Sequence, residues 1–79
     1  MLKFHIIMGV TIHTKRMVQK LSKDKEALII VIDYELSSEL EPKNLYGAIY
    51  CSPEQAKSFA EQADEVVFHR YAFVLPKLK

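Results

Sequence analysis

The sequence predicts a small α+β fold in which strands and helices follow the order β-α-β-β-α-β. Three observations lead to this prediction. The segment Leu2–Ile12 alternates between apolar even positions and mostly polar odd positions, which is typical of a strand with one buried face. The segment Ala27–Leu36 is rich in β-branched residues, which favours a second strand. After each of two predicted strands, the apolar residues change to the spacing of an amphipathic helix.

Length and composition indicate one soluble domain, 1–79, because 79 residues are too few for a second core. The net charge of +1 argues against a strong nucleic-acid binder. The single cysteine, Cys51, excludes an internal disulfide and favours a reducing compartment, so we expect a cytoplasmic location. The longest apolar run, Ala27–Ile32, is far shorter than the ~20 residues of a membrane span. We therefore expect no contact with a membrane.

The first helix is predicted over Thr14–Ser22. Met17, Val18 and Leu21 form its apolar stripe, and most of the remaining positions are polar or basic. The outward face is cationic. It carries the residues that we consider for binding an anionic partner: Lys15, Arg16, Lys20 and, just beyond the helix, Lys23.

The second half of the chain predicts a strand, a helix and a last strand. In the third strand, Leu45–Cys51, the residue Gly47 marks a bulge or a close approach of another backbone. The segment 52–55 has the pattern of a capping box with proline at the first helical position, so a helix begins there. The last strand runs from Glu65 to about Leu75. We expect its odd positions, with His69, to face inward, because burying His69 costs less than burying Arg70.

This order of elements predicts a ferredoxin-like βαββαβ sandwich. Two right-handed βαβ units would place both helices on one face of a four-stranded antiparallel sheet. The first and third strands would then lie at the centre of the sheet. This is an architecture with many unrelated functions, and it does not define a family.

A two-layer sandwich leaves the second face of the sheet uncovered, and here that face would be apolar. Monomers seldom expose a continuous apolar patch of this extent, and two-fold homodimers are the commonest oligomers. The sequence therefore predicts a homodimer or protein-partner interface on this face. Its main residues would be Ile7, Ile29, Val31, Tyr46, Tyr50 and Phe68.

Residues that carry chemistry are present, but they form no recognisable motif. His5, His13, His69 and Cys51 lack the spacing of metal ligands, so we predict no metal and no cofactor. His5 and His69 would come together if the first and last strands are neighbours. For Cys51 we expect a buried, inert thiol. Because no catalytic constellation is visible, the sequence favours a non-enzymatic interaction or regulatory module over an enzyme.

Two other functions stay open at this point. Nucleic-acid binding would use the basic first helix or a sheet face with Tyr46 and Tyr50. The segment 46–49 partly resembles the RNP1 segment of RRM domains, which implies base stacking on Tyr46, although Asn44 and Leu45 depart from that pattern. A small dimeric α+β barrel enzyme would place its site between sheet and helices. Its candidate residues would be His5, Asp33, Tyr50 and His69.

Overall fold

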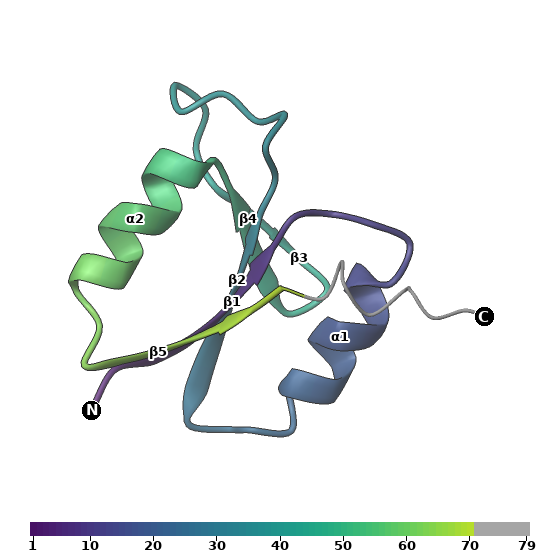
Figure 1. The fold of residues 1–79 in the computed structure, drawn as a ribbon, viewed down its shortest axis with the longest axis vertical. Coiled ribbons are helices and arrows are strands. Elements are labelled where there is room, and N and C mark those ends of the chain that lie inside the picture. The colour runs from purple at the N-terminus through teal and green to yellow at the C-terminus, as the bar shows by residue number, and fades with distance from the viewer. Residues whose placement is uncertain (71–79) are drawn as a thin grey trace.

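The computed structural model describes residues 1–70, which form two helices and five strands (Figure 1). In chain order these are β1 (Lys3–Met8), α1 (Thr14–Leu21), β2 (Ala27–Ile32), β3 (Lys43–Leu45), β4 (Ala48–Cys51), α2 (Pro53–Glu61) and β5 (Glu65–His69). The predicted α+β class is confirmed. The predicted continuation of the last strand to Leu75 lies outside the described residues from position 71 onward.

The sheet is five-stranded and mostly parallel, with the order β3-β4-β2-β1-β5. Strand β1 pairs in parallel with β2 on one side and with β5 on the other, and β2 pairs in parallel with β4. The predicted four-stranded antiparallel, ferredoxin-like sheet is therefore wrong. In that fold a third strand lies between the first two, whereas here β1 and β2 are direct neighbours.

The cause of the difference lies in the segment that was predicted as one strand, Leu45–Cys51. It is a turn followed by a strand, because Tyr46 and Gly47 both have positive φ, 55° and 84°. Two successive positive values are typical of the tight turn that joins antiparallel strands. The turn makes the short strand β3 pair with β4 at the edge of the sheet. Among the described residues, apart from the chain neighbours of Gly47, no atom lies within 4 Å of its Cβ position, so no close contact explains this glycine. Leu45 pairs with Ala48 across a two-residue turn, so Gly47 is not a bulge.

The two helices cover opposite faces of the sheet, and the prediction that they share one face is also wrong (Figure 1). The connection from β1 to β2 and the connection from β4 to β5 cross the sheet in opposite directions. Because each crossover between parallel strands is right-handed, opposite directions place the helices on opposite faces. The molecule therefore has three layers, with the sheet in the middle.

Each face of the sheet has its own buried cluster. The cluster under α2 consists of Phe4, Ile6, Ile30, Ile32, Cys51 and Ala56, with Phe59 packed edge-on against Phe4. The cluster under α1 consists of Ile7, Val18, Ile29, Val31 and Ala48. Apolar residues on both faces of β2 are typical of a strand that is buried on both sides in a parallel sheet.

The start of α2 confirms the predicted capping box. The Ser52 hydroxyl accepts a hydrogen bond from the Gln55 amide at 3.2 Å, and the Gln55 side chain accepts one from the Ser52 amide at 3.0 Å. Pro53 occupies the first helical position. These bonds fix the point at which the chain leaves β4 and begins to cross the sheet. Within residues 1–70, neither helix is long and apolar enough to cross a membrane.

The substitution Ile30→Ala tests the burial of the central sheet. Ile30 is fully buried under α2, so its truncation leaves a cavity and should lower the free energy of unfolding by about 2–5 kcal/mol. The measurement is equilibrium urea unfolding followed by circular dichroism. Leu28→Ala is the matched control, because Leu28 lies on the same strand and face but is 48% exposed. Equal losses in the two variants would contradict the described packing.

Candidate functional site

A cleft opens where the carboxyl ends of β1 and β2 meet at one edge of the sheet. Its volume is about 360 Å³, and it is lined by Gly9, Val10, Asp33, Tyr34 and Glu35. All five residues follow directly after β1 or β2, so the parallel pairing of these two strands brings them together. In open parallel sheets, ligands bind in the crevice outside the carboxyl ends of the strands. The cleft is thus in the place where this type of sheet binds small molecules.

Gly9 forms one wall of the cleft at the point where the chain leaves β1. Its φ of +113° is a conformation that residues with a Cβ atom rarely adopt. A Cβ atom at this position would lie 3.8 Å from Tyr34 Cε2, which is an ordinary contact. The backbone conformation, and not the available space, is therefore the reason for glycine at this position.

Asp33 also lines the cleft and is held by hydrogen bonds of its own backbone. Its amide donates to the Cys51 carbonyl at 2.8 Å, and its carbonyl accepts from the Leu36 amide at 3.0 Å. Its side-chain Oδ1 accepts from the Glu35 amide at 3.0 Å. These bonds fix Asp33 beside the cleft, and its carboxylate can accept hydrogen bonds from a ligand.

The loop between the cleft and α1 is ordered by two threonines. The Thr11 amide donates to Thr14 Oγ1 at 2.7 Å, and the Thr14 amide donates back to the Thr11 carbonyl at 3.1 Å. Thr14 is only 3% exposed, so this pair is part of the packed structure. It holds the start of α1 close to the end of β1.

The basic residues predicted for anion binding are all exposed on α1 or in the turn after it: Lys15, Arg16, Lys20 and Lys23. The Lys15 ammonium lies over the ring of Tyr46, 4.9 Å from its centroid, in a cation–π contact. The sequence predicts Lys15 and Tyr46 on separate surfaces, and the structure brings them together. Anion binding by these residues stays a prediction.

The residues predicted for the partner interface do not form one surface. Ile7, Ile29 and Val31 are 0%, 4% and 0% exposed, because α1 covers them. Tyr50 is half-buried against the same cluster, and Tyr46 lies in the turn beside β4. Phe68, 56% exposed, lies on β5 at the other edge of the sheet.

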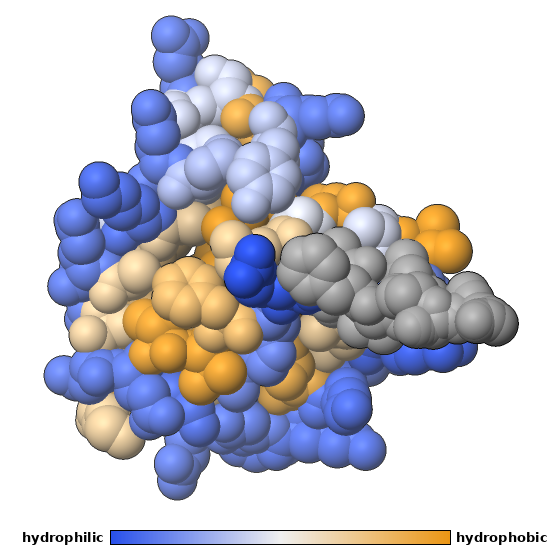
Figure 2. Space-filling model, viewed as in Figure 1, coloured by the Kyte–Doolittle hydropathy of each residue, from blue (hydrophilic) through white to orange (hydrophobic). Residues whose placement is uncertain are grey.

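Apolar surface gathers over β5 and beside α2 (Figure 2). A groove of about 220 Å³ lies in this region, and its lining consists of Ile6, Ile32, Pro53, Ala56, Lys57, Ala60 and Phe68. The groove lies on the α2 face of the sheet, whereas the predicted interface residues Ile7, Ile29 and Val31 lie on the α1 face. Phe68 is the one predicted interface residue that lines the groove. Self-association of the chain stays a prediction, and it has lost the continuous apolar face on which it was based.

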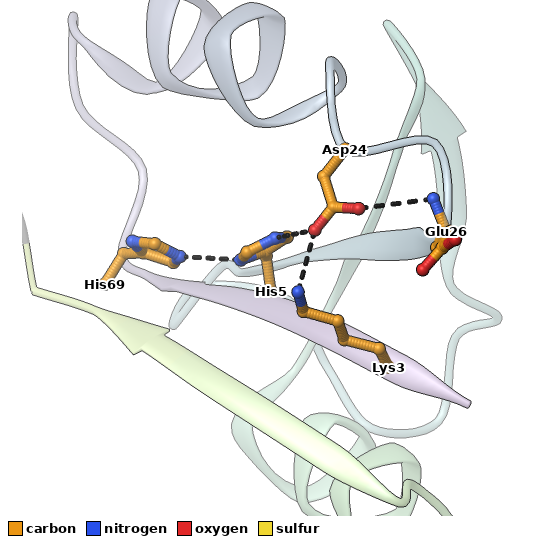
Figure 3. A network of polar contacts seen from close by, with 5 residues as sticks. All are labelled: Lys3, His5, Asp24, Glu26 and His69. Carbon is orange, nitrogen blue, oxygen red and sulfur yellow. Dashed lines mark hydrogen bonds and ion pairs between the residues drawn. The ribbon is translucent and has the colours of Figure 1, made fainter. Parts of the chain in front are cut away.

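A second polar feature is a network that joins β1, β5 and the turn after α1 (Figure 3). His5 Nδ1 lies 3.0 Å from His69 Nε2, and His5 Nε2 lies 3.1 Å from Asp24 Oδ2. The same carboxylate oxygen accepts a hydrogen bond from the Lys3 ammonium at 2.9 Å. The other oxygen, Oδ1, accepts from the Glu26 amide at 3.3 Å. The expectation that His5 and His69 meet on neighbouring strands is confirmed.

The network shifts the protonation of its members. The hydrogen bond from Lys3 is the main reason why the pKa of Asp24 falls from 3.8 to about 2, and the bond to His5 adds to it. The same bond to Asp24 raises the pKa of Lys3. Burial, together with the charge of His5, lowers the pKa of His69.

Cys51 is fully buried at the end of β4, and burial raises the pKa of its thiol to about 11. The expectation of a buried cysteine is therefore confirmed, and a thiol with this pKa is a poor nucleophile at neutral pH. Burial also raises the pKa of Tyr50.

Comparisons with known proteins give no relative from which a function could be transferred. No family model, no curated protein and no solved structure matches this chain. Across residues 1–70, no group of three or more His, Cys, Asp or Glu side chains lies close enough together to hold a metal ion. The functional argument therefore depends on the geometry of the cleft and of the histidine network.

Sequence reasoning identified Asp33, but it missed the other residues of the cleft and the role of Asp24. A signal for the cleft is present in the chain. Gly9 directly follows one strand, and Asp33 directly follows the next. The positions of Gly9 and Asp33 indicate a shared site only if the two strands are parallel neighbours, because only then do the carboxyl ends of the strands meet.

The substitution Lys3→Met tests the origin of the low Asp24 pKa. It removes the ammonium that donates to Oδ2, so the Asp24 pKa should rise from about 2 toward 3.8. The measurement is a ¹³C NMR titration of the Asp24 carboxyl group in both proteins. Because the folded pKa lies below the ordinary value, this group stabilises the native chain above pH 3.8. That contribution is lost as the pH falls through 2, and an unchanged Asp24 pKa in the variant would contradict this assignment.

Proposed function

We propose that this domain binds a small, hydroxyl-rich molecule, such as a ribose or another sugar unit, in the cleft beside Gly9 and Asp33. The observation that carries the proposal is the position of Asp33. Asp33 lines a cleft outside the carboxyl ends of the two neighbouring parallel strands β1 and β2. This is the general place for ligands in parallel sheets.

The chemistry of the lining supports hydroxyl groups as the ligand. Asp33 and Glu35 have carboxylate oxygens, which accept hydrogen bonds, and none of the described residues that line the cleft is basic. Hydrogen bonds to a charged acceptor are the stronger ones, and neighbouring hydroxyls of a sugar can donate to one carboxylate. The exposed side chain of Tyr34, which also lines the cleft, offers an apolar surface to the carbon skeleton of a sugar.

The volume of the cleft also supports a small ligand. Pockets for small molecules commonly enclose ~300–1,000 Å³, and this cleft of about 360 Å³ lies at the lower end of that range. A single sugar or nucleoside fits this size better than a polymer does. We therefore propose a binding function for the domain and assign no catalytic step to the chain.

The substitution Asp33→Asn tests the proposal in a titration of the ¹⁵N-labelled chain with D-ribose, adenosine and methyl glucoside. We expect at least one of them to shift the amide signals of Gly9, Val10 and Tyr34. Asparagine keeps the oxygen that accepts from Glu35 but removes the charge, so binding should weaken about tenfold.

Two controls make this experiment specific. Glu39→Gln changes a carboxylate of the same loop that does not line the cleft, so it should leave binding unchanged. Inorganic phosphate, which is repelled by the two carboxylates, should not shift the cleft signals. The proposal fails if none of the three hydroxyl compounds perturbs the cleft, or if Asp33→Asn binds as tightly as the original chain.

A further inference from the structure

The His5–His69 contact lies outside the cleft and has a consequence for the edge of the sheet. Within residues 1–70, β5 is an edge strand of the sheet and pairs only with β1. His69 is the last residue of β5 and pairs with Ile7, so the contact ties the end of β5 to the central strand. His5 itself is only 8% exposed, and Figure 3 shows both rings lying side by side on the α1 side of the sheet.

We propose that the His5–His69 pair acts as a proton-responsive clasp at the end of β5. The contact holds β5 on β1 when both imidazoles are neutral and when one of them is protonated, and it breaks when both are protonated. The proposal rests on the positions of the four ring nitrogens, and it is independent of the ligand proposed for the cleft.

The contacts define which nitrogens carry hydrogen when the pair is neutral. The carboxylate of Asp24 can only accept, so His5 Nε2 carries the hydrogen and donates it at 3.1 Å. In a neutral imidazole the other nitrogen has no hydrogen, so His5 Nδ1 is an acceptor. His69 Nε2 must then carry a hydrogen and donate it across 3.0 Å.

One excess proton preserves every contact. A protonated His5 donates from both nitrogens, to Asp24 and to His69, and the hydrogen of His69 moves from Nε2 to Nδ1. The positive charge of His5 then faces the carboxylate of Asp24. The first proton therefore stays within the closed network.

A second proton removes the contact. Both facing nitrogens would then carry hydrogen at a separation of 3.0 Å, with no acceptor between them. Two positive rings with centroids 5.1 Å apart also repel each other. The low pKa of His69 agrees with this conflict, since burial and the charge of His5 both oppose its protonation.

The surrounding charges do not relieve the conflict. Asp24 Oδ2 is shared with Lys3, so one carboxylate already faces one ammonium before any proton is added. Among the described residues, the other charged neighbours in sequence or contact are Lys23, Lys25, Glu26, Glu65 and Arg70. Strand β2 presents the apolar Ile29 next to His5, and α1 packs on this face with its apolar residues Met17, Val18 and Leu21.

Hydrogen exchange of the full chain between pH 7 and pH 4.5 tests the clasp. The measured quantity is the protection factor of the β5 amides, corrected for the intrinsic pH dependence of exchange. If opening takes up one proton, protection of β5 should fall by about tenfold per pH unit below the ordinary histidine value of 6.5. The β2 amides of residues 30–32 should keep their protection in the same sample.

Variants and a spectroscopic measurement separate the clasp from general acid unfolding. His69→Gln keeps an uncharged donor for His5 but cannot take up a proton, so the pH dependence of β5 protection should disappear. His13→Gln, outside this network, should behave like the original chain. ¹⁵N NMR of the original chain should show that His5 Nε2 carries a hydrogen at neutral pH, whether or not a variant folds.

Each of these measurements can overturn the proposal. It fails if β5 and β2 lose protection together, if β5 protection does not depend on pH, or if His69→Gln retains the pH dependence. It also fails if His5 carries a hydrogen on Nδ1 and none on Nε2 at neutral pH. None of these results bears on sugar binding in the cleft, so the two proposals stand or fall separately.

Discussion

The burial of strand β1 on both sides is the constraint from which the rest of this structure follows. Ile6 and Ile7 are consecutive, so their side chains point to opposite faces of the sheet, and they are 1% and 0% exposed. Both faces therefore need a helix. The two helices can lie on opposite faces only if the crossovers run in opposite directions, which places β2 and β5 on either side of β1.

Much of the local structure could be predicted from the sequence, because local signals determine it. Helical spacing located both helices, and the segment 52–55 located the start of α2 through its capping box. The topology could not be predicted in the same way. It depends on the positive φ of Tyr46, a residue type that seldom adopts this conformation, and on the resulting hairpin of β3 and β4.

The sequence did contain a sign of the second buried face. Ile29 and Val31 are apolar at positions that a two-layer fold leaves uncovered, and for that reason they were predicted to contact a partner. In the structure α1 of the same chain covers them. The pairing of His5 with His69 could be predicted despite the wrong topology, because the first and last strands are neighbours in both architectures. The cleft could not, since it requires parallel strands.

The most direct test of this account is a set of NOE contacts from Ile6 and Ile7 in the isotope-labelled chain. The account predicts that Ile6 contacts Ala56 of α2, that Ile7 contacts Val18 of α1, and that β1 and β2 show the cross-strand pattern of parallel pairing. Close Hα–Hα contacts between β1 and β2, or an Ile7 side chain without contacts to α1, would contradict it.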